Sequence, residues 1–419
     1  MSFESFAQAQ SFLLWSTFVI ALVMGAVVNK TNFCTMGAVS DMVNMGDFGR
    51  MRAWLLAIAV AIVGMLVLES MGLAAPGDAF PPYRAGNLLI AENLIGGLMF
   101  GIGMTLASGC GNKCLIRIGG GNVKSIFVFA IIGVIAYFMV NPFPGSDKTL
   151  MSVLFINWIR PMSINLGASQ DLGTVIAGKD AAMTARIVIG AAIALLMLWF
   201  VFKSADFRSS FDNILGGLVV GLAVLAAWYV SSNVSIGDDH MTLRGFVQNW
   251  DFLADSPAGK PADSRPLAPQ SFTFINPMGQ TVGWAANGFS SALLTFGVMA
   301  FGGVIAGSLL WSVVTRSFRI EWFNDTKDFV THVIGAVLMG FGGVLAMGCT
   351  IGQGITGVST LAIGSFIAWG AIVLGSGLTM KVQYYKMVYE DDATFAKALI
   401  TGLVDFKLLP AGMRKLEAI

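Results

Sequence analysis

Four cysteines are the residues of this chain best suited to selective chemistry, and all lie beside or within apolar segments: Cys34, Cys110, Cys114 and Cys349. Three short stretches that contain them interrupt hydrophobic runs with glycine and polar residues: 32–37, 109–124 and 348–360. Glycine lowers helix stability, and non-helical backbone inside a membrane persists only within protein or beside water. The three stretches are therefore predicted to line a cavity or a permeation path.

Basic and neutral donor side chains accompany these cysteines. Lys113 and Arg117 are four residues apart and would share one face of a helix. A helix that restarts after a break presents free N–H groups, which attract anions. A basic pair beside thiols and free N–H groups suits a small dianion. The neutral donors that could bind the same anion are Thr35, Thr350, Gln353, Thr356, Ser359 and Thr360.

Each of these features also has a simpler interpretation. A membrane cysteine is most often a small apolar filler, and many of the glycines could serve helix packing. Lys113 and Arg117 could extend to the membrane surface. A metal site is not expected, because the two histidines are scattered and Cys110 with Cys114 lacks the two further ligands of a structural zinc. No cofactor and no catalytic residue are predicted.

The elements that must position these residues are membrane helices. Hydrophobic residues make up 56% of the chain, charged residues 12%, and the mean hydropathy is +0.75. A soluble protein has roughly 25% charged residues, whereas a membrane-spanning helix needs about 20 predominantly apolar ones. The net charge of +1 gives no indication of a nucleic-acid partner, and none is expected. Nine spans are predicted, at 11–29, 53–73, 92–108, 124–140, 186–202, 213–230, 291–311, 329–347 and 363–379.

Two long polar connections separate groups of these spans, at about 141–185 and 231–290. The second is predicted to be an extramembranous insertion because of its prolines: Pro257, Pro261, Pro266 and Pro269. Lysine and arginine near span ends mark the cytoplasmic side of a membrane protein. Their distribution favours a cytoplasmic C-terminus and, with nine spans, an N-terminus outside.

Two segments of the chain match each other at a constant spacing of 239 residues. The matched pairs are Gly96/Gly335, Gly101/Gly340, Gly103/Gly342, Ala107/Ala346, Gly109/Gly348 and Cys110/Cys349. The two predicted spans lie five apart in order, so they enter the membrane from opposite faces. The sequence thus predicts one transmembrane transport domain over 1–419, all-α, with short broken or re-entrant helices and an inverted repeat of about 11–140 and 213–380.

Three motifs resemble the YeeE/YedE family of sulfur-compound transporters: FCTMGAVSD at 33–41, SGCGNKCLIRIGGGNVK at 108–124 and MGCTIGQGITGVSTLA at 347–362. The resemblance implies a multi-pass protein of the bacterial inner membrane that takes up thiosulfate or a related sulfur or selenium species. It implies substrate contact by Cys34, Cys110 and Cys349, whereas Cys114 resembles an addition. It also implies a TusA-like cytoplasmic sulfurtransferase as a possible partner.

The favoured hypothesis is therefore a permease rather than an enzyme, lying in the lipid bilayer and passing the anion along reduced, uncharged thiols. Its substrate-binding residues would be Cys34, Cys110, Cys349, Lys113, Arg117, Thr35, Thr350 and Gln353. The main alternative is a membrane thiol oxidoreductase that uses Cys110 and Cys114. A third is a structural membrane scaffold, for which the cysteines would be dispensable.

Overall fold

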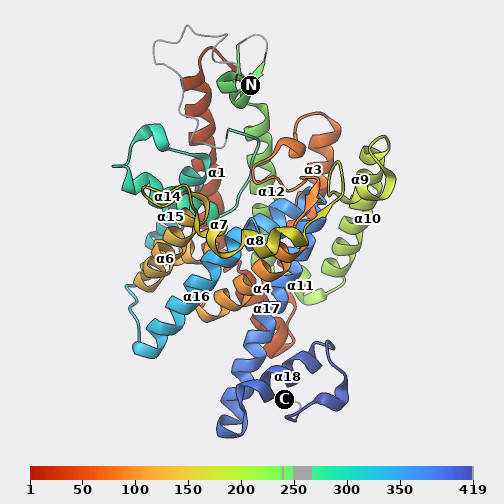
Figure 1. Ribbon diagram of the computed structural model, residues 1–419, viewed down its shortest axis with the longest axis vertical. Helices are drawn as coiled ribbons and strands as arrows, with labels where there is room; N and C mark the ends of the chain where they lie inside the picture. The colour runs from red at the N-terminus through yellow and green to blue at the C-terminus, as the bar shows by residue number, and fades with distance from the viewer. Residues whose placement is uncertain (238–239, 249–266, 418–419) are drawn as a thin grey trace.

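The computed structural model describes residues 1–237, 240–248 and 267–417, and its two chain ends lie at opposite ends of the molecule (Figure 1). Within these residues, nine helices are long and apolar enough to cross a membrane, which confirms the predicted number. They are α1 (Phe6–Thr31), α3 (Gly49–Ser70), α4 (Ile90–Leu106), α6 (Val123–Val140), α10 (Ala182–Phe202), α12 (Phe211–Asn233), α15 (Phe296–Val314), α16 (Thr326–Leu345) and α17 (Ile363–Val388).

Short helices make up most of the remaining structure: α2 (Thr35–Ser40), α5 (Gly111–Gly119), α7 (Leu150–Leu154), α8 (Ile156–Ile159), α9 (Leu172–Ala177), α11 (Ala205–Ser209), α13 (Leu243–Gln248), α14 (Ile275–Ala286) and α18 (Phe395–Asp405). Strands are two residues long and form two small sheets in the described part of the chain: β1 (Ser2–Phe3), β4 (Ser235–Ile236) and β5 (Met241–Thr242) in one, β2 (Asn87–Leu88) and β3 (Ile164–Asn165) in the other. The all-α prediction is confirmed.

The predicted spans differ most from the structure at the end of α17. The hydropathy of the sequence falls at Lys381, so the span was predicted to end at 379, yet the helix continues to Val388. The Lys381 ammonium lies 3.7 Å from the carboxylate of Asp405 at the end of α18. A charge with a protein partner does not end a helix, and the last turns of α17 pack against α18.

The two long connections contain ordered structure. The first, 141–185, holds α7, α8, β3 and α9, and β3 pairs with β2 directly before α4. Of the second, Pro257, Pro261 and Pro266 lie outside the described residues. In its last part, 267–286, the side chains of Phe272, Phe274, Ile275 and Met278 are fully buried in the protein. This part returns to the helical bundle and ends in α14.

Glycine allows the long helices to approach each other closely, as it does at many membrane helix crossings. In the contact between α1 and α15, a methyl group added at Gly307 would collide with the carbonyl of Leu22. In the contact between α3 and α12, one added at Gly217 would lie 2.6 Å from the carbonyl oxygen of Ala53. Backbone therefore lies against backbone at both crossings.

The central crossing of α4 and α16 has the same character and a regular pattern. A methyl group at Gly96 would lie 2.6 Å from the backbone nitrogen of Ala346, and one at Gly335 would lie 2.6 Å from that of Ala107. From Gly96 to Ala107 along the first helix, the contacted residue of the second moves back from Ala346 to Gly335, so the helices are antiparallel. Gly96 and Ala107 correspond to Gly335 and Ala346 at the 239-residue spacing. The two contacts are therefore repeat-related copies of each other.

Candidate functional site

Each of the three cysteines expected to contact substrate follows a helix that ends in the same backbone conformation. The residue two positions before each cysteine is left-handed: Asn32 (φ 51°), Ser108 (φ 57°) and Met347 (φ 55°). Asparagine tolerates this conformation at a helix end, whereas a long side chain such as Met347 adopts it at a cost of about 1–3 kcal/mol. Such a cost persists only where the surrounding packing holds the backbone, so the breaks are fixed features of the fold.

Each cysteine then begins the next helical segment. Cys349 precedes a turn that continues into the π-helix η6 (Gly352–Gly357), and its Sγ accepts the backbone N–H of Gly352 at 3.4 Å. The amides three residues beyond the other two cysteines likewise face the thiols: Gly37 for Cys34 and Lys113 for Cys110. The sulfur of Cys349 therefore acts as an N-cap acceptor, whereas Cys34 and Cys110 are the N-cap residues of α2 and α5 without a side-chain cap hydrogen bond, each at the electropositive start of a short helix.

The three segments meet in the interior of the bundle. The thiol of Cys110 lies beside that of Cys34 and beside the hydroxyl of Thr350. Cys349 lies beside Thr273 and the backbone amide of Phe274, where α14 begins. All four cysteines are buried and free, with Cys114 one helical turn beyond Cys110 in the apolar core.

The two basic residues lie on α5 near these thiols. The Lys113 ammonium donates to the side-chain oxygen of Asn32 at 2.5 Å, which ties α5 to the end of α1. Arg117 forms no ion pair within the described residues and is partly exposed. Both are close enough to Cys34 to interact with it electrostatically. Arg50 also interacts with Cys34, although it binds Asp41, and sequence reasoning missed it.

The neutral donors separate into two groups. Thr356, Ser359 and Thr360 donate to backbone carbonyls at 2.7 Å and are engaged in the fold. In contrast, the described part of the chain offers no hydrogen-bond partner to the buried oxygens of Thr35 Oγ1, Thr350 Oγ1 and Gln353 Oε1. A native protein leaves few buried polar atoms unpaired, and such atoms commonly await a ligand, ion or water. The second group therefore remains the better set of candidates.

Gln353 also stabilises the break itself. Its side-chain amide donates to the backbone carbonyl of Ala346, at the end of α16. That carbonyl would otherwise lack a partner, because the helix stops before the residue that would donate to it.

Tyr83 was missed by sequence reasoning because it lies in the connection between α3 and α4. Its side chain is 1% exposed, its hydroxyl has no partner in the described part of the chain, and it is near enough to Cys349 to interact with it. Burial, together with Cys349, raises the pKa of Tyr83 well above its ordinary value. The hydroxyl therefore stays protonated and can donate.

A buried ion-pair network fixes one end of the third broken segment. The guanidinium of Arg84 contacts Glu69 at 2.6 Å and donates to the carbonyl of Thr360 at 2.8 Å. Glu69 also contacts Arg186 at 2.8 Å, and Arg186 contacts Asp171 at 2.7 Å. Breaking one member of such a network leaves a buried charge unpaired, which is strongly destabilising.

Stability is expected to fall on acidification through Asp171, at the start of α9. Burial alone would raise the pKa of Asp171, but hydrogen bonds from Arg186, Ser169 and Thr174 outweigh it and hold the pKa well below its ordinary value. The stabilisation is thus present above the ordinary value of about 4 and is lost as the pH falls towards the folded-state pKa. In thermal unfolding of the purified protein, Asp171→Asn should unfold at a lower temperature than wild type at pH 7, with a clearly smaller difference at about pH 2. The exposed Asp180→Asn is the control, and an unchanging difference for Asp171→Asn would contradict the assignment.

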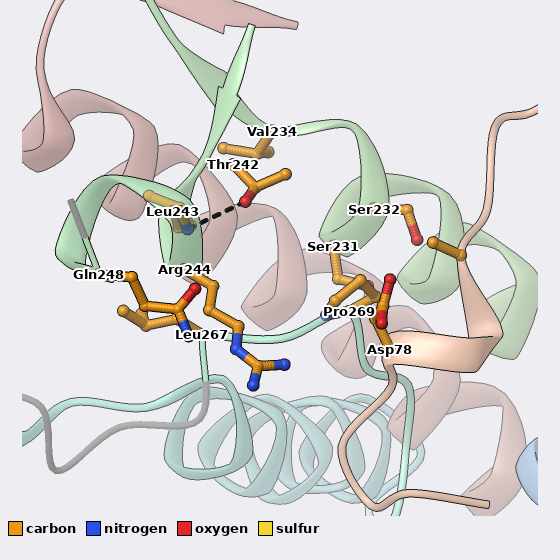
Figure 2. A pocket seen from close by; sticks show the side chains of 12 residues that line it. Asp78, Ser231, Ser232, Val234, Thr242, Leu243, Arg244, Gln248, Leu267 and Pro269 are labelled. Carbon is orange, nitrogen blue, oxygen red and sulfur yellow. Dashed lines mark hydrogen bonds between the residues drawn. The ribbon is translucent and has the colours of Figure 1, made fainter. Parts of the chain in front are cut away.

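A cavity of about 370 Å³ has no cysteine in its lining, and Figure 2 shows the side chains that border it. It is bordered by Ser231 at the end of α12, by Arg244 of α13 and by Asp78 and Pro269 of the connections. An acidic and a basic side chain share its wall, so it offers no selective attraction for an anion. The cavity is therefore a weaker candidate than the buried thiols, although Pro269 begins the segment that leads to Thr273.

The nine membrane-spanning helices of the described residues, with interrupted segments meeting between them, define a multi-pass membrane protein built as a transporter. A family model described as sulphur transport matches residues 30–378. The chain belongs to this family, and the expected YeeE/YedE membership is confirmed. The family consists of transporters, so the chain is a transporter rather than an enzyme, and the oxidoreductase alternative loses its support.

Two similar proteins carry names that state a substrate. The thiosulfate transporter TsuA of Spirochaeta thermophila is 23% identical over 376 residues, covering 87% of this chain and 97% of that protein. The thiosulfate transporter TsuA of Escherichia coli strain K12 is 22% identical over 384 residues, covering 87% of this chain and 92% of that protein. The similarity extends over nearly the whole length of both proteins.

Proposed function

We propose that this chain is a bacterial inner-membrane permease that takes up thiosulfate, or a closely related sulfur or selenium anion, through a path of reduced cysteines. The substrate is suggested by the two similar proteins named as thiosulfate transporters. The observation that carries the mechanism is that Cys34, Cys110 and Cys349 each begin a short helix and converge in the interior.

The anion would pass from Cys349 to Cys110 and then to Cys34. A neutral thiol is a weak hydrogen-bond donor, and weak sites in series let an ion leave as readily as it enters. The starts of the short helices add the attraction of free N–H groups. The thiols must stay protonated, because a thiolate would repel the anion.

The polar neighbours complete this path in the proposal. Lys113 and Arg117 would attract the anion at the inner mouth, beside Cys34. The unpaired oxygens of Thr35, Thr350 and Gln353 mark the positions at which a bound anion, with its water, would be contacted. Neutral donors bind an anion without holding it as strongly as a fixed charge would.

The proposed architecture is an inverted repeat. One set of four spans (α1, α3, α4 and α6) precedes α10 and another set of four (α12, α15, α16 and α17) follows it, so corresponding spans run in opposite directions. The reciprocal contacts Gly96 with Ala346 and Gly335 with Ala107 support a two-fold axis through the central crossing. The C-terminus lies in the cytoplasm in this proposal, which puts Lys113 and Arg117 on the inner side.

A TusA-like cytoplasmic sulfurtransferase is the proposed partner, and it would receive the sulfur compound at the inner mouth. The support is the family resemblance of the three motifs. Copurification of the two proteins from membranes tests this pairing.

Uptake of radiolabelled thiosulfate into proteoliposomes tests the proposed function. We expect saturable uptake that exceeds that of protein-free vesicles and that is competed by unlabelled thiosulfate. Sulfite, selenite and sulfide as competitors identify which related species share the path. Uptake no faster than in protein-free vesicles would refute the proposal, provided that the reconstituted protein remains folded and its thiols remain reduced.

A further inference from the structure

The segment before α14 contains a second residue pair that matches the first break. Phe33 and Cys34 have their counterparts, at the same spacing of 239 residues, in Phe272 and Thr273. The two phenylalanines are both buried, at 3% and 0% exposure. Sequence reasoning did not include this pair, because a cysteine is replaced by a threonine and because the segment follows a long polar connection.

The surroundings of the two pairs also correspond. The ring of Phe33 stacks on Trp54 of α3 with centroids 4.8 Å apart, and the ring of Phe272 contacts Phe296 of α15 at 5.8 Å. The helices α3 and α15 occupy equivalent places in the two sets of spans. The match in sequence is therefore accompanied by a match in packing.

The neighbours of Cys34 and Thr273 also correspond. Cys34 lies beside Cys110 at the start of α5, and Thr273 lies beside Cys349 at the start of the third broken segment. The Thr273 side chain rests on Gly352, where an added methyl group would collide with its hydroxyl. Each half of the site thus has a cysteine at the start of a helix and a second small polar side chain against it.

The Thr273 hydroxyl is available to a ligand. The residue is 7% exposed, and its Oγ1 makes no hydrogen bond to nitrogen or oxygen in the described part of the chain, where its polar neighbour is the Cys349 thiol. The nearby Oγ1 of Thr350 and the hydroxyl of Tyr83 are also buried and unpaired in that part. The hydroxyls of Thr273 and Tyr83 lie near Cys349 and that of Thr350 lies beside Cys110, an arrangement that a bound anion would complete.

We propose that Thr273 occupies, in the second repeat, the place that Cys34 occupies in the first. Its hydroxyl binds the transported anion together with the Cys349 thiol. Thr273 and Cys349 are thus the outer counterpart of the Cys34–Cys110 pair. This inference rests on the proposed function. A hydroxyl is a stronger hydrogen-bond donor than a thiol. Thr273 therefore favours an anion with oxygen at the end that it contacts, which makes it a specificity-determining residue for a thio-oxyanion.

Three variants compared in the thiosulfate uptake assay test the role of the hydroxyl. Thr273→Val keeps the shape of the side chain and should raise the half-saturation concentration about tenfold or more, because a hydrogen bond to an anion is lost. Thr273→Ser should stay within about threefold of wild type. Thr17→Val is the matched control, since Thr17 is also buried and donates to the carbonyl of Leu13 in α1. Normal uptake by Thr273→Val, or equal loss in Thr273→Ser, would overturn the inference.

A second measurement tests the placement without relying on transport. Thr273→Cys should form a disulfide with Cys349 under mild oxidation, detected by the mass of the linked peptides and reversed by reductant. A linked peptide that joins position 273 to another cysteine, or the absence of any link, would overturn the proposed pairing. If wild type transports no thiosulfate, the proposed function and this inference both fail. If Cys349→Ala loses transport while Thr273→Val keeps it, only this inference fails.

Discussion

Thiosulfate uptake is expected to fall roughly 10- to 100-fold when Cys349 is replaced by alanine. The thiol lies at the start of the third broken segment, where the backbone amide of Gly352 faces it, and among the described residues no other thiol is assigned to that half of the site. Loss of a hydrogen bond to a charged group costs about 1.5–3 kcal/mol, and each 1.4 kcal/mol corresponds to a factor of about ten. Cys110→Ala should show a similar loss, because Cys110 begins α5 in the equivalent position. Initial rates of labelled uptake at a fixed amount of folded protein provide the measurement.

Cys114→Ala is the matched control for this experiment. Cys114 is as buried as Cys110 and lies one turn away, but it lies within α5 rather than at its start. Its replacement should change uptake by less than about twofold. Wild-type uptake by both Cys110→Ala and Cys349→Ala would refute the thiol path. Loss in Cys110→Ala and Cys114→Ala alone would instead favour chemistry between those two thiols.

The membrane helices could be predicted from the sequence because the bilayer imposes a length and a composition on each of them. The three breaks could also be predicted, since their glycines and polar residues interrupt apolar runs at Cys34, Cys110 and Cys349. In each broken segment, the glycines and polar residues that interrupt the helix are close together in the sequence. No long-range information was needed to find them.

The partners of these cysteines could not be predicted in the same way. Tyr83 and Thr273 reach Cys349 from connections whose sequence resembles surface loops, and only the folded bundle brings them together. Arg84 is hidden for the same reason, because its partner Glu69 ends α3 and its other contact is the carbonyl of Thr360. The 239-residue spacing did contain a signal for Thr273, in the phenylalanine that precedes it.

The two halves of the site differ in charge, which has a consequence for the direction of passage. Lys113 and Arg117 lie near Cys34, whereas the described neighbours of Cys349 are hydroxyls and backbone amides. In the proposed orientation, an anion moves from neutral donors towards fixed positive charge. Electrostatic attraction therefore favours inward movement as far as Cys34, and release there requires hydration from the inner side.

Destabilisation of the whole bundle is expected when the central crossing is widened, and the two helices should respond alike. An added methyl group at Gly96 or at Gly335 meets backbone nitrogen at 2.6 Å in both cases, and backbone cannot move aside as a side chain can. The helices α4 and α16 must then separate, at a cost of roughly 1–3 kcal/mol for overpacking. We expect Gly96→Ala and Gly335→Ala to lower the temperature of thermal unfolding in detergent by similar amounts.

The control for this pair is Gly370→Ala in α17, where an added methyl group meets nothing within 4 Å. Alanine has a higher helix propensity than glycine by about 1 kcal/mol, so this variant should unfold at the same temperature as wild type or higher. Gly96→Ala and Gly335→Ala change the two repeat-related contacts of the crossing between α4 and α16. A large effect in one and none in the other would contradict the reciprocal contact, and with it the two-fold relation on which the inverted repeat and the assignment of Thr273 depend.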